Sequence, residues 1–330
     1  MRSSSKFRTA TALAAVSVAA AFALTACSST SSKDDGITVV ASTNVWGDVA
    51  QAVAGDKLTV TSIINEPSAD PHSFEATPAD AAKITDASLV VYNGGGYDQF
   101  ITDVLDAGKG EQKTVNAYNL LDGGIHAGET AGESHDGHTH GAVNEHVWFD
   151  IPTVDAVAHS VADQLSALDP DNAATYEDNA KAYSQKLAGV TAITDSIAAA
   201  HAGAPVAQTE PIAHYLLVAA ELKDATPEEF TNAIEDGNDP SPAAIAATRQ
   251  LLSEKQARAL VYNIQTQDKV TQDMRTTAET AGVPVVEVTE TLPRAWTTFS
   301  GRRRPRSRSQ TPSLPSNYLP HHFREEPIGL

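Results

Sequence analysis

The alternation of hydrophobic and polar residues predicts strands and helices in regular succession over the first part of the chain. Segments 37–43, 58–64 and 88–95 are rich in β-branched and other apolar residues, which predicts buried strands. Between them, segment 44–55 spaces valines four residues apart and ends in a glycine, which predicts a helix. Segment 78–86 opens with a proline suited to the first turn of another helix. This alternation favours a parallel α/β sheet.

The middle of the chain is dominated by helical periodicity. From residue 153 onward, apolar residues recur at three- and four-residue spacings and predict one helix. The break at 169–171 predicts the start of another, with Asp169 as the cap and Pro170 at the first helical position. The second periodic segment runs for about thirty residues, a length of roughly 45 Å at 1.5 Å per residue. We expect this long helix to bridge two domains.

A second α/β unit follows the long helix. Strands are predicted at 205–209, 259–263 and 284–289, with helical segments between them. The predicted fold class is therefore α/β, with two lobes of parallel sheets flanked by helices and joined by one long rigid helix. The predicted boundaries are an N-terminal lobe at 37–168, the connecting helix at 169–202 and a C-terminal lobe at 203–293.

The first 36 residues have the composition of a targeting segment. Three basic residues precede a short apolar run at 11–24, which is too short for a good transmembrane span and predicts a signal peptide over 1–26. Cys27, the single cysteine, follows "LTA" as in a bacterial lipobox, so we expect a lipid anchor on it. The remainder of 27–36 then serves as a flexible tether. This predicts an extracytoplasmic lipoprotein on the bacterial cell membrane; an ordinary secretory signal, with Cys27 incidental, is the alternative.

The last 37 residues differ sharply from those before them. Segment 294–330 has seven arginines, no lysine, five prolines and no amphipathic period. It is compatible with a basic disordered tail that has its own role. The abrupt change suggests instead that a shift of reading frame replaced the native C-terminus. Re-sequencing the coding DNA tests this hypothesis, which fails if no other frame continues the helix–strand pattern.

Charge narrows the possible partners. The formal net charge is −19, and segment 27–293 alone holds 13 basic and 40 acidic residues. Such a field attracts cations and repels nucleic acid, so we expect no nucleic-acid partner. The single cysteine also excludes a disulfide framework and a cysteine-based zinc site. We expect a monomer.

Two histidines stand out as candidate metal ligands. His72 lies in "EPSADPHSFEATPAD" after a predicted strand, at the edge where open α/β sheets place ligands. A lone loop histidine is also compatible with a structural or solvated role. His146 lies in "NEHVWFD", directly before apolar residues, so we expect it to be held where a loop re-enters the core.

A histidine-rich segment precedes His146. Segment 124–141 is rich in glycine and has no visible period, which predicts a mobile, exposed loop. Its histidines, together with acidic neighbours, could bind a metal weakly and feed or sense it near the main site. A solvated loop with incidental histidines is the alternative. The four histidines are His126, His135, His138 and His140.

Together these features resemble a known family. "DPHSFEATPAD", "NEHVWFD" after a histidine-rich loop, the long central helix and the lipobox are similar to the cluster A-I metal-binding lipoproteins. Those proteins are the solute-binding components of ABC importers for zinc or manganese. The resemblance covers residues 37–293. It implies two α/β lobes, a metal in the cleft with two ligands from each lobe, and an ABC permease as partner.

The resemblance also implies a ligand set. His72 and His146 form the first pair. The third ligand is Glu210 in "AQTEPIAHYLL", where many zinc-binding members have histidine and many manganese-binding members have glutamate. His214, four residues later on the following helix, is a weaker substitute.

The fourth ligand, usually an acid, falls in "VVEVTETLP". Glu290 matches best, while Glu287 is expected on the opposite face of the strand by alternation. Two imidazoles and two carboxylates suit Zn²⁺ or Mn²⁺ and balance a divalent charge. Because four protein ligands leave no position open for water or substrate, the set favours capture over catalysis.

Competing functions follow from the same residues. A metallohydrolase could use His72, His146 and a carboxylate, but neither H-E-x-x-H nor G-x-S-x-G is present in the sequence to support it. A surface adhesin or a periplasmic metal buffer on the same fold is a further alternative. We therefore expect a binding protein and no enzymatic activity.

The histidine-rich loop and Glu210 give conflicting indications of which metal is bound. The histidine-rich loop favours zinc, because such loops are typical of zinc-specific members of the family. Glu210 in place of histidine favours manganese. Because divalent affinity rises from Mn²⁺ towards Zn²⁺ at any such site, zinc binding in vitro would not by itself decide. We predict Zn²⁺, with Mn²⁺ as the alternative.

Overall fold

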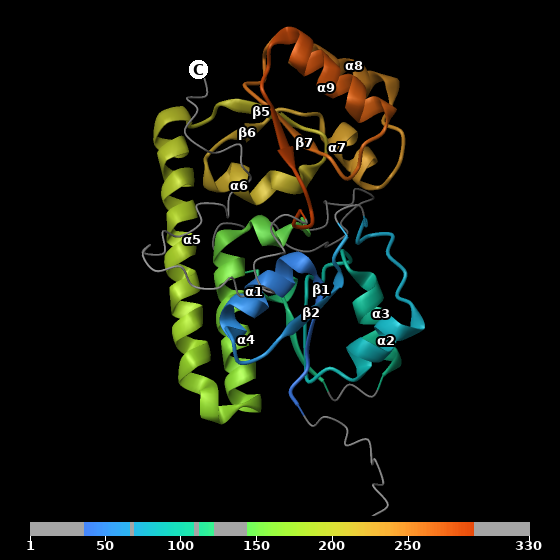
Figure 1. Ribbon diagram of the computed structural model, residues 1–330. Coiled ribbons are helices and arrows are strands. Elements are labelled where there is room, and N and C mark those ends of the chain that lie inside the picture. The colour runs from blue at the N-terminus through green and yellow to red at the C-terminus, as the bar shows by residue number, and fades with distance from the viewer. Residues whose placement is uncertain (1–35, 67–68, 109–111, 122–143, 294–330) are drawn as a thin grey trace, which may run out of the picture. The chain divides into compact units, whose positions relative to one another are not determined.

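The first lobe is built on a parallel sheet that follows the predicted strand–helix alternation (Figure 1). The computed structural model describes residues 36–66, 69–108, 112–121 and 144–293. The strand order in the sheet of the first lobe is β2-β1-β3-β4, with every pairing parallel. The strands are β1 Val39–Thr43, β2 Val60–Ile64, β3 Leu89–Tyr92 and β4 Lys113–Asn116.

Helices bury both faces of this sheet, which explains why its strands read as continuous apolar runs. On one face the core includes Trp46 and Val157, and on the other it includes Ile84 and Ile101. Alternation sends Val39 and Val40 to opposite faces. The helices are α1 Asn44–Ala54, α2 Pro78–Thr85, α3 Gln99–Ala107 and α4 Ile151–Leu168, with short 3-10 turns η1 Tyr118–Leu120 and η2 Val147–Phe149.

A glycine turn follows β3. Gly94 has a φ of 77°, and a Cβ there would lie 2.3 Å from the Asn116 side chain, so only glycine fits this turn. The Asp98 carboxylate accepts hydrogen bonds from the backbone N–H groups of Asn93 (2.7 Å) and Gly94 (2.8 Å). The turn therefore fixes Tyr97, which is 1% exposed, at the carboxyl end of the sheet.

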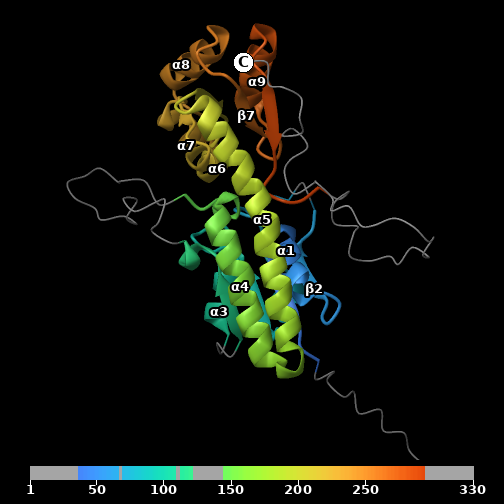
Figure 2. The ribbon, with the colours of Figure 1, turned by 90° about the vertical axis from the view of Figure 1, so that its left-hand side faces the viewer.

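The long helix is present and packs against both lobes (Figures 1 and 2). α5 spans Ala173–His201, 29 residues, after the 3-10 turn η3 Pro170–Asn172. Tyr176 and Leu187 are buried in the first lobe's core, and α5 also contacts α6 of the second lobe. The α-helix thus starts three residues later than predicted. The Asp169 carboxylate accepts hydrogen bonds from the Asn172 side chain (2.8 Å) and the Tyr176 hydroxyl (2.6 Å).

The second lobe repeats the arrangement with strand order β6-β5-β7-β8, again parallel. One face packs Phe230 and Met274, and the other packs Ile212. The strands are β5 Pro205–Gln208, β6 Lys223–Asp224, β7 Leu260–Asn263 and β8 Val285–Val288. The helices are α6 His214–Ala219, α7 Glu228–Glu235, α8 Pro242–Ser253 and α9 Lys269–Ala281, with η4 Pro211–Ala213. The sequence did not predict β6, because two exposed residues carry no alternation.

Hydrogen bonds join the two lobes within the compact unit that begins at Ile37. The Asn44 side chain, directly after β1, donates to the Leu292 carbonyl (2.9 Å) and accepts from its N–H (2.8 Å). The Asn144 side chain donates to the Pro211 carbonyl at 2.8 Å. These contacts involve residues close in sequence to His146, Glu210 and Glu290, so they also frame the region where ligands are expected.

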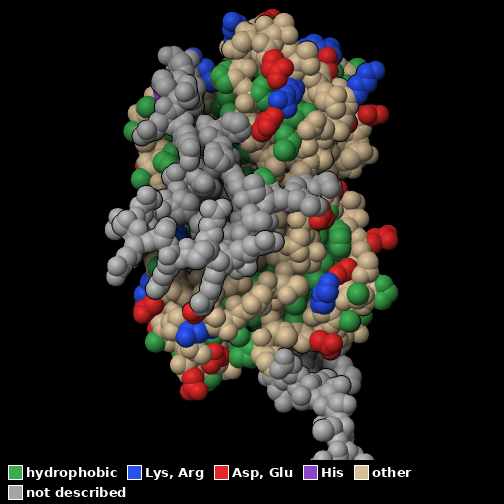
Figure 3. Space-filling view, viewed as in Figure 1, with side chains coloured by type: hydrophobic (Ala, Val, Ile, Leu, Met, Phe, Trp, Pro, Cys, Tyr) green, Lys and Arg blue, Asp and Glu red, His purple; other side chains and the backbone are tan. Residues whose placement is uncertain are grey.

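Several predictions concern residues outside those described. They are the signal peptide at 1–26, Cys27 with most of the tether, the histidine-rich loop with His126, His135, His138 and His140, and the tail at 294–330. Within the described ranges, no helix is long and apolar enough to cross a membrane. On the face shown in Figure 3, the Lys and Arg side chains of the described residues are scattered and form no basic patch.

Candidate metal centre

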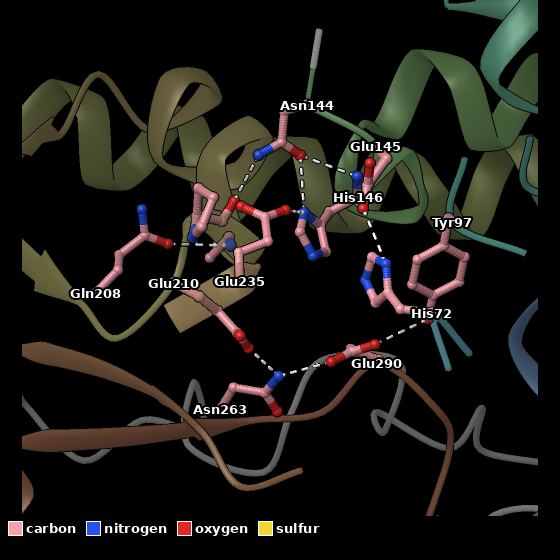
Figure 4. A network of polar contacts seen from close by, with 12 residues as sticks. His72, Tyr97, Asn144, Glu145, His146, Gln208, Glu210, Glu235, Asn263 and Glu290 are labelled. Atoms are coloured by element: carbon pink, nitrogen blue, oxygen red, sulfur yellow. Dashed lines mark hydrogen bonds and ion pairs between the residues drawn. The ribbon is translucent and has the colours of Figure 1, made fainter. Parts of the chain in front are cut away.

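The four predicted ligands come from both lobes, three of them from segments that follow strands and one from the start of a 3-10 turn. His72 lies in the turn after β2, and His146 immediately precedes η2. Glu210 follows β5, and Glu290 follows β8. Figure 4 shows the two imidazoles and the two carboxylates turned toward a common space. This is the edge at which open parallel sheets bind ligands.

The position of His72 is set by a local turn. The Asp70 carboxylate accepts hydrogen bonds from the His72 backbone N–H (2.9 Å) and the Ser73 hydroxyl (3.0 Å). The imidazole meets the Tyr97 ring edge-on, with 4.9 Å between centroids, and its centroid is 6.4 Å from that of His146. The side chain is 29% exposed, so His72 lies on the solvent side of the centre.

His146 is the buried member of the pair, at 2% exposure. Its backbone N–H donates to the Asn144 side-chain oxygen (2.9 Å), and its Nδ1 lies 3.0 Å from the same oxygen. The next residue, Val147, is fully buried and anchors the segment. Burial first, and then the nearby imidazoles of His72 and His214, lower the pKa of His146 to about 3. The ring is therefore neutral at physiological pH, the form that binds metals.

One asparagine links the two acids of the second lobe. Asn263 ends β7, and its side-chain Nδ2 donates to Glu210 and, at 2.8 Å, to Glu290. Both glutamates are 2% exposed. The Tyr97 hydroxyl of the first lobe donates to the other oxygen of Glu290 at 3.2 Å. The two acids are thus held by neutral donors, so their negative charge, once they ionise, would be left for a cation to balance.

Burial and mutual repulsion raise the pKa values of these acids. Burial is the largest cause for Glu210, whose pKa rises to about 8, and the Glu290 charge raises it further. Burial also raises the pKa of Glu290 to about 7, with the Asp70 charge adding to the rise. Glu145 and Glu235 behave in the same way, with pKa values of about 7 and 8. A divalent cation at this place would relieve the repulsion.

The distances between ligand atoms divide the four predicted ligands into two groups. Among the described residues, the ligand atoms of Asp70, His72 and Glu290 all lie within 4.8 Å of one another. His146 and Glu210 border the same space, through the ring contact with His72 and the shared Asn263. The structure thus brings His72 and Glu290 to ligand spacing and places His146 and Glu210 beside them.

Sequence reasoning missed five residues of the centre. Asn263 ends a predicted strand at the ligand-binding edge, and that position was a usable signal. Glu145 adjoins His146 within the quoted motif. Asp70 lies two residues before His72 within the quoted motif, and its carboxylate was a usable signal. Tyr97 and Glu235 carried no local signal, because only the fold brings them near the two histidines.

His214, considered as a substitute ligand, and Glu287, expected on the opposite face of its strand, have other contacts. His214 is the first residue of α6, and its ring lies 5.1 Å from that of Tyr215. Glu287 forms an ion pair with Arg275 of α9 at 2.7 Å. Its carboxylate is therefore committed away from Glu290, in agreement with the expected alternation along β8.

Fold and centre together define a two-lobed metal-binding protein of the solute-binding class. The chain belongs to the ZnuA family, described as "Zinc-uptake complex component A periplasmic", which matches residues 39–301. The family resemblance stated from the sequence is thereby confirmed.

Curated relatives belong to the same class. The chain is 37% identical over 175 residues to "Iron ABC transporter substrate-binding lipoprotein MtsA" of Streptococcus pyogenes, covering 50% of this chain and 54% of the relative. It is 35% identical over 173 residues to "Manganese ABC transporter substrate-binding lipoprotein scaA" of Streptococcus gordonii, covering 50% and 53%. The match spans about half the length of these relatives. They are named as substrate-binding proteins and not as enzymes, which agrees with the prediction of a binding protein.

Solved structures confirm the fold. The periplasmic zinc-binding protein TroA from Treponema pallidum superposes with a TM-score of 0.61 at 18% identity, covering 79% of this chain and 91% of that protein. The solute-binding protein FpvC from Pseudomonas aeruginosa, solved with Mn²⁺, gives a TM-score of 0.61 at 21% identity, with 77% and 88% covered. At these identities the likeness concerns the architecture alone.

Proposed function

We propose that this protein captures one divalent cation, zinc, between its two lobes and delivers it to an ABC permease. The ligands are His72, His146, Glu210 and Glu290. The observation that carries the proposal is the meeting of two imidazoles and two buried carboxylates, from both lobes, around one space. Two carboxylates balance the charge of the ion, and two neutral imidazoles favour a borderline metal such as zinc.

The choice of zinc over manganese rests on nitrogen ligands and the histidine-rich loop. Imidazole suits zinc better than manganese, whereas carboxylate suits both. The loop histidines, His126, His135, His138 and His140, add weak sites that collect zinc near the cleft. Manganese is the alternative cargo, and Glu210 is the residue that favours it.

The location follows from the same proposal. The protein is extracytoplasmic and monomeric, with a lipid on Cys27 that anchors it to the bacterial cell membrane. The relatives named as lipoproteins of ABC transporters support this placement. A tether of about ten residues would then let the lobes reach a permease in the same membrane.

A competition titration tests the function. The chain from residue 27 onward is stripped of metal and titrated with zinc and manganese against chelators of known affinity, with metal content measured directly. We expect one tight zinc ion per chain, which survives deletion of 126–140 and is lost in the His72→Ala, His146→Ala double variant. Loss of tight binding on loop deletion alone, or a tighter site for manganese, would contradict the proposal.

A further inference from the structure

The tripeptide Asn144-Glu145-His146 contacts the same ring nitrogen of both candidate imidazoles. The Asn144 side-chain oxygen lies 3.0 Å from Nδ1 of His146. A Glu145 carboxylate oxygen lies 3.3 Å from Nδ1 of His72. Glu235 also approaches Nδ1 of His146, but at 3.8 Å it is beyond hydrogen-bond distance, so Asn144 is the acceptor there.

An acceptor at Nδ1 decides which nitrogen can bind a metal. A neutral imidazole carries one N–H and one lone pair. If Nδ1 carries the hydrogen and donates it to an oxygen, the lone pair lies on Nε2. In Figure 4 the other ring nitrogen of each imidazole points toward the space beside Glu210 and Glu290. Metal-binding histidines in general donate their second nitrogen to a carboxylate or carbonyl oxygen in this way.

The tripeptide itself is held from both lobes. The Asn93 side chain donates to the Glu145 carbonyl at 2.8 Å, and its oxygen accepts from the fully buried Trp46 indole at 3.2 Å. On the other side, Asn144 donates to the Pro211 carbonyl, next to Glu210, at 2.8 Å. A segment fixed at both ends can hold two rings in one orientation at little further entropic cost.

We propose that Asn144 and Glu145 are positioning residues that fix both ligand imidazoles with Nε2 facing the ion. One tripeptide thus supplies a ligand, His146, and orients it together with His72 from a different loop. Neither Asn144 nor Glu145 touches the ion. This inference rests on the proposed metal-binding function and adds which atoms bind and what holds them.

The test combines affinity with a signature of the bound nitrogen. Asn144→Ala and Glu145→Ala remove the acceptors, while Asn144→Asp and Glu145→Gln keep an acceptor oxygen. Asn232→Ala and Glu75→Ala, at exposed positions, are matched controls. Zinc affinity is measured by competition on the chain from residue 27, and long-range ¹H–¹⁵N spectra of the zinc-loaded, histidine-labelled protein identify the coordinated nitrogen.

We expect Nε2 coordination of both His72 and His146 in the parent protein. Each alanine variant should lose about 10- to 100-fold in zinc affinity, the usual effect of removing a residue that orients a ligand. Glu145→Gln should recover most of it. Asn144→Asp should recover less, because it keeps the acceptor for His146 but loses the donor to the Pro211 carbonyl. The controls should bind like the parent.

Coordination through Nδ1 at either histidine in the parent protein overturns the inference. Because this result comes from the parent protein, it does not depend on whether any variant folds. Parent-like affinity and spectra in both alanine variants also overturn it. If the parent binds no divalent ion tightly, the proposed function itself fails, a result distinct from either of these.

Discussion

His146 shows at the scale of one residue how burial prepares a candidate metal ligand. Its ring is enclosed, its Nδ1 faces Asn144, and its pKa is lowered to about 3 by burial and neighbouring imidazoles. No proton competes with a metal for this ring near neutral pH. His72, which is more exposed, lies in a separate loop, so the two histidines differ in environment.

Replacing the buried histidine should remove tight binding. We expect His146→Ala to weaken zinc affinity by more than about 100-fold, because losing a ligand costs more than losing the residue that orients it. His159→Ala, on the exposed side of α4, is the matched control. Competition titration measures both, and equal affinities would show that His146 is not a ligand.

Glu210 should control the choice of metal. A histidine there replaces a hard carboxylate by an imidazole, which zinc prefers over manganese. We expect Glu210→His to raise the zinc-to-manganese affinity ratio by about tenfold or more, equivalent to about 1.4 kcal/mol. The exposed Glu229→His on α7 should leave the ratio unchanged. An unchanged ratio in Glu210→His would argue that residue 210 does not contact the ion.

At the scale of elements, the start of α4 supports the metal centre. The Asp150 side chain caps this helix by accepting from the Thr153 N–H (3.1 Å) and hydroxyl (2.5 Å). Asp150 ends the 3-10 turn that begins after His146, so the cap and the ligand share one short segment. The start of α4 therefore helps to set the place of His146.

Removing the helix cap at Asp150 should affect the stability of the fold more than the binding of metal. We expect Asp150→Ala to lower the free energy of unfolding of the metal-free protein by about 1–2 kcal/mol, measured by urea denaturation. Asp150→Asn keeps the capping oxygen and should lose much less. If both variants lose equally, the carboxylate charge, and not the cap, is what matters at this position.

At the scale of the whole molecule, the centre couples the two lobes. Two of the proposed ligands belong to each lobe, and contacts such as the hydrogen bond from Tyr97 to Glu290 cross between the lobes. An ion that binds only the folded arrangement stabilises the protein by mass action. Zinc at a thousandfold excess over its dissociation constant should add about 4 kcal/mol, which a rise in melting temperature and its reversal by a chelator would reveal.

The metal-free protein should lose stability as pH rises. Glu145, Glu210, Glu235 and Glu290 have folded pKa values of about 7 to 8, above their ordinary 4.5. The protonated acids favour the folded state, so their contribution is complete below about pH 4.5 and is lost as pH rises through 7 to 8. Melting temperatures of metal-free protein between pH 5 and 8.5 measure this, with the zinc-loaded protein as control. A flat or rising profile without metal would contradict it.

Local sequence patterns by themselves determined the order of strands and helices and the positions of the two candidate histidines. Period-two and helical spacings predicted the strand–helix order and the long helix, because backbone periodicity fixes which residues face the core. The positions of His72 and His146 at strand ends and loop re-entry were also visible, since each lies beside a recognisable local signal.

Only the tertiary structure decided which side chains meet. Tyr97 and Glu290 are 193 residues apart, yet they share a hydrogen bond. Asn263 joins two acids from different strand ends, and Asn144 and Glu145 orient rings from two loops. No local spacing encodes such contacts, because they arise where two sheets place their carboxyl edges together. The sequence thus identified candidate ligands, and the packing of the lobes supplied the groups that hold them.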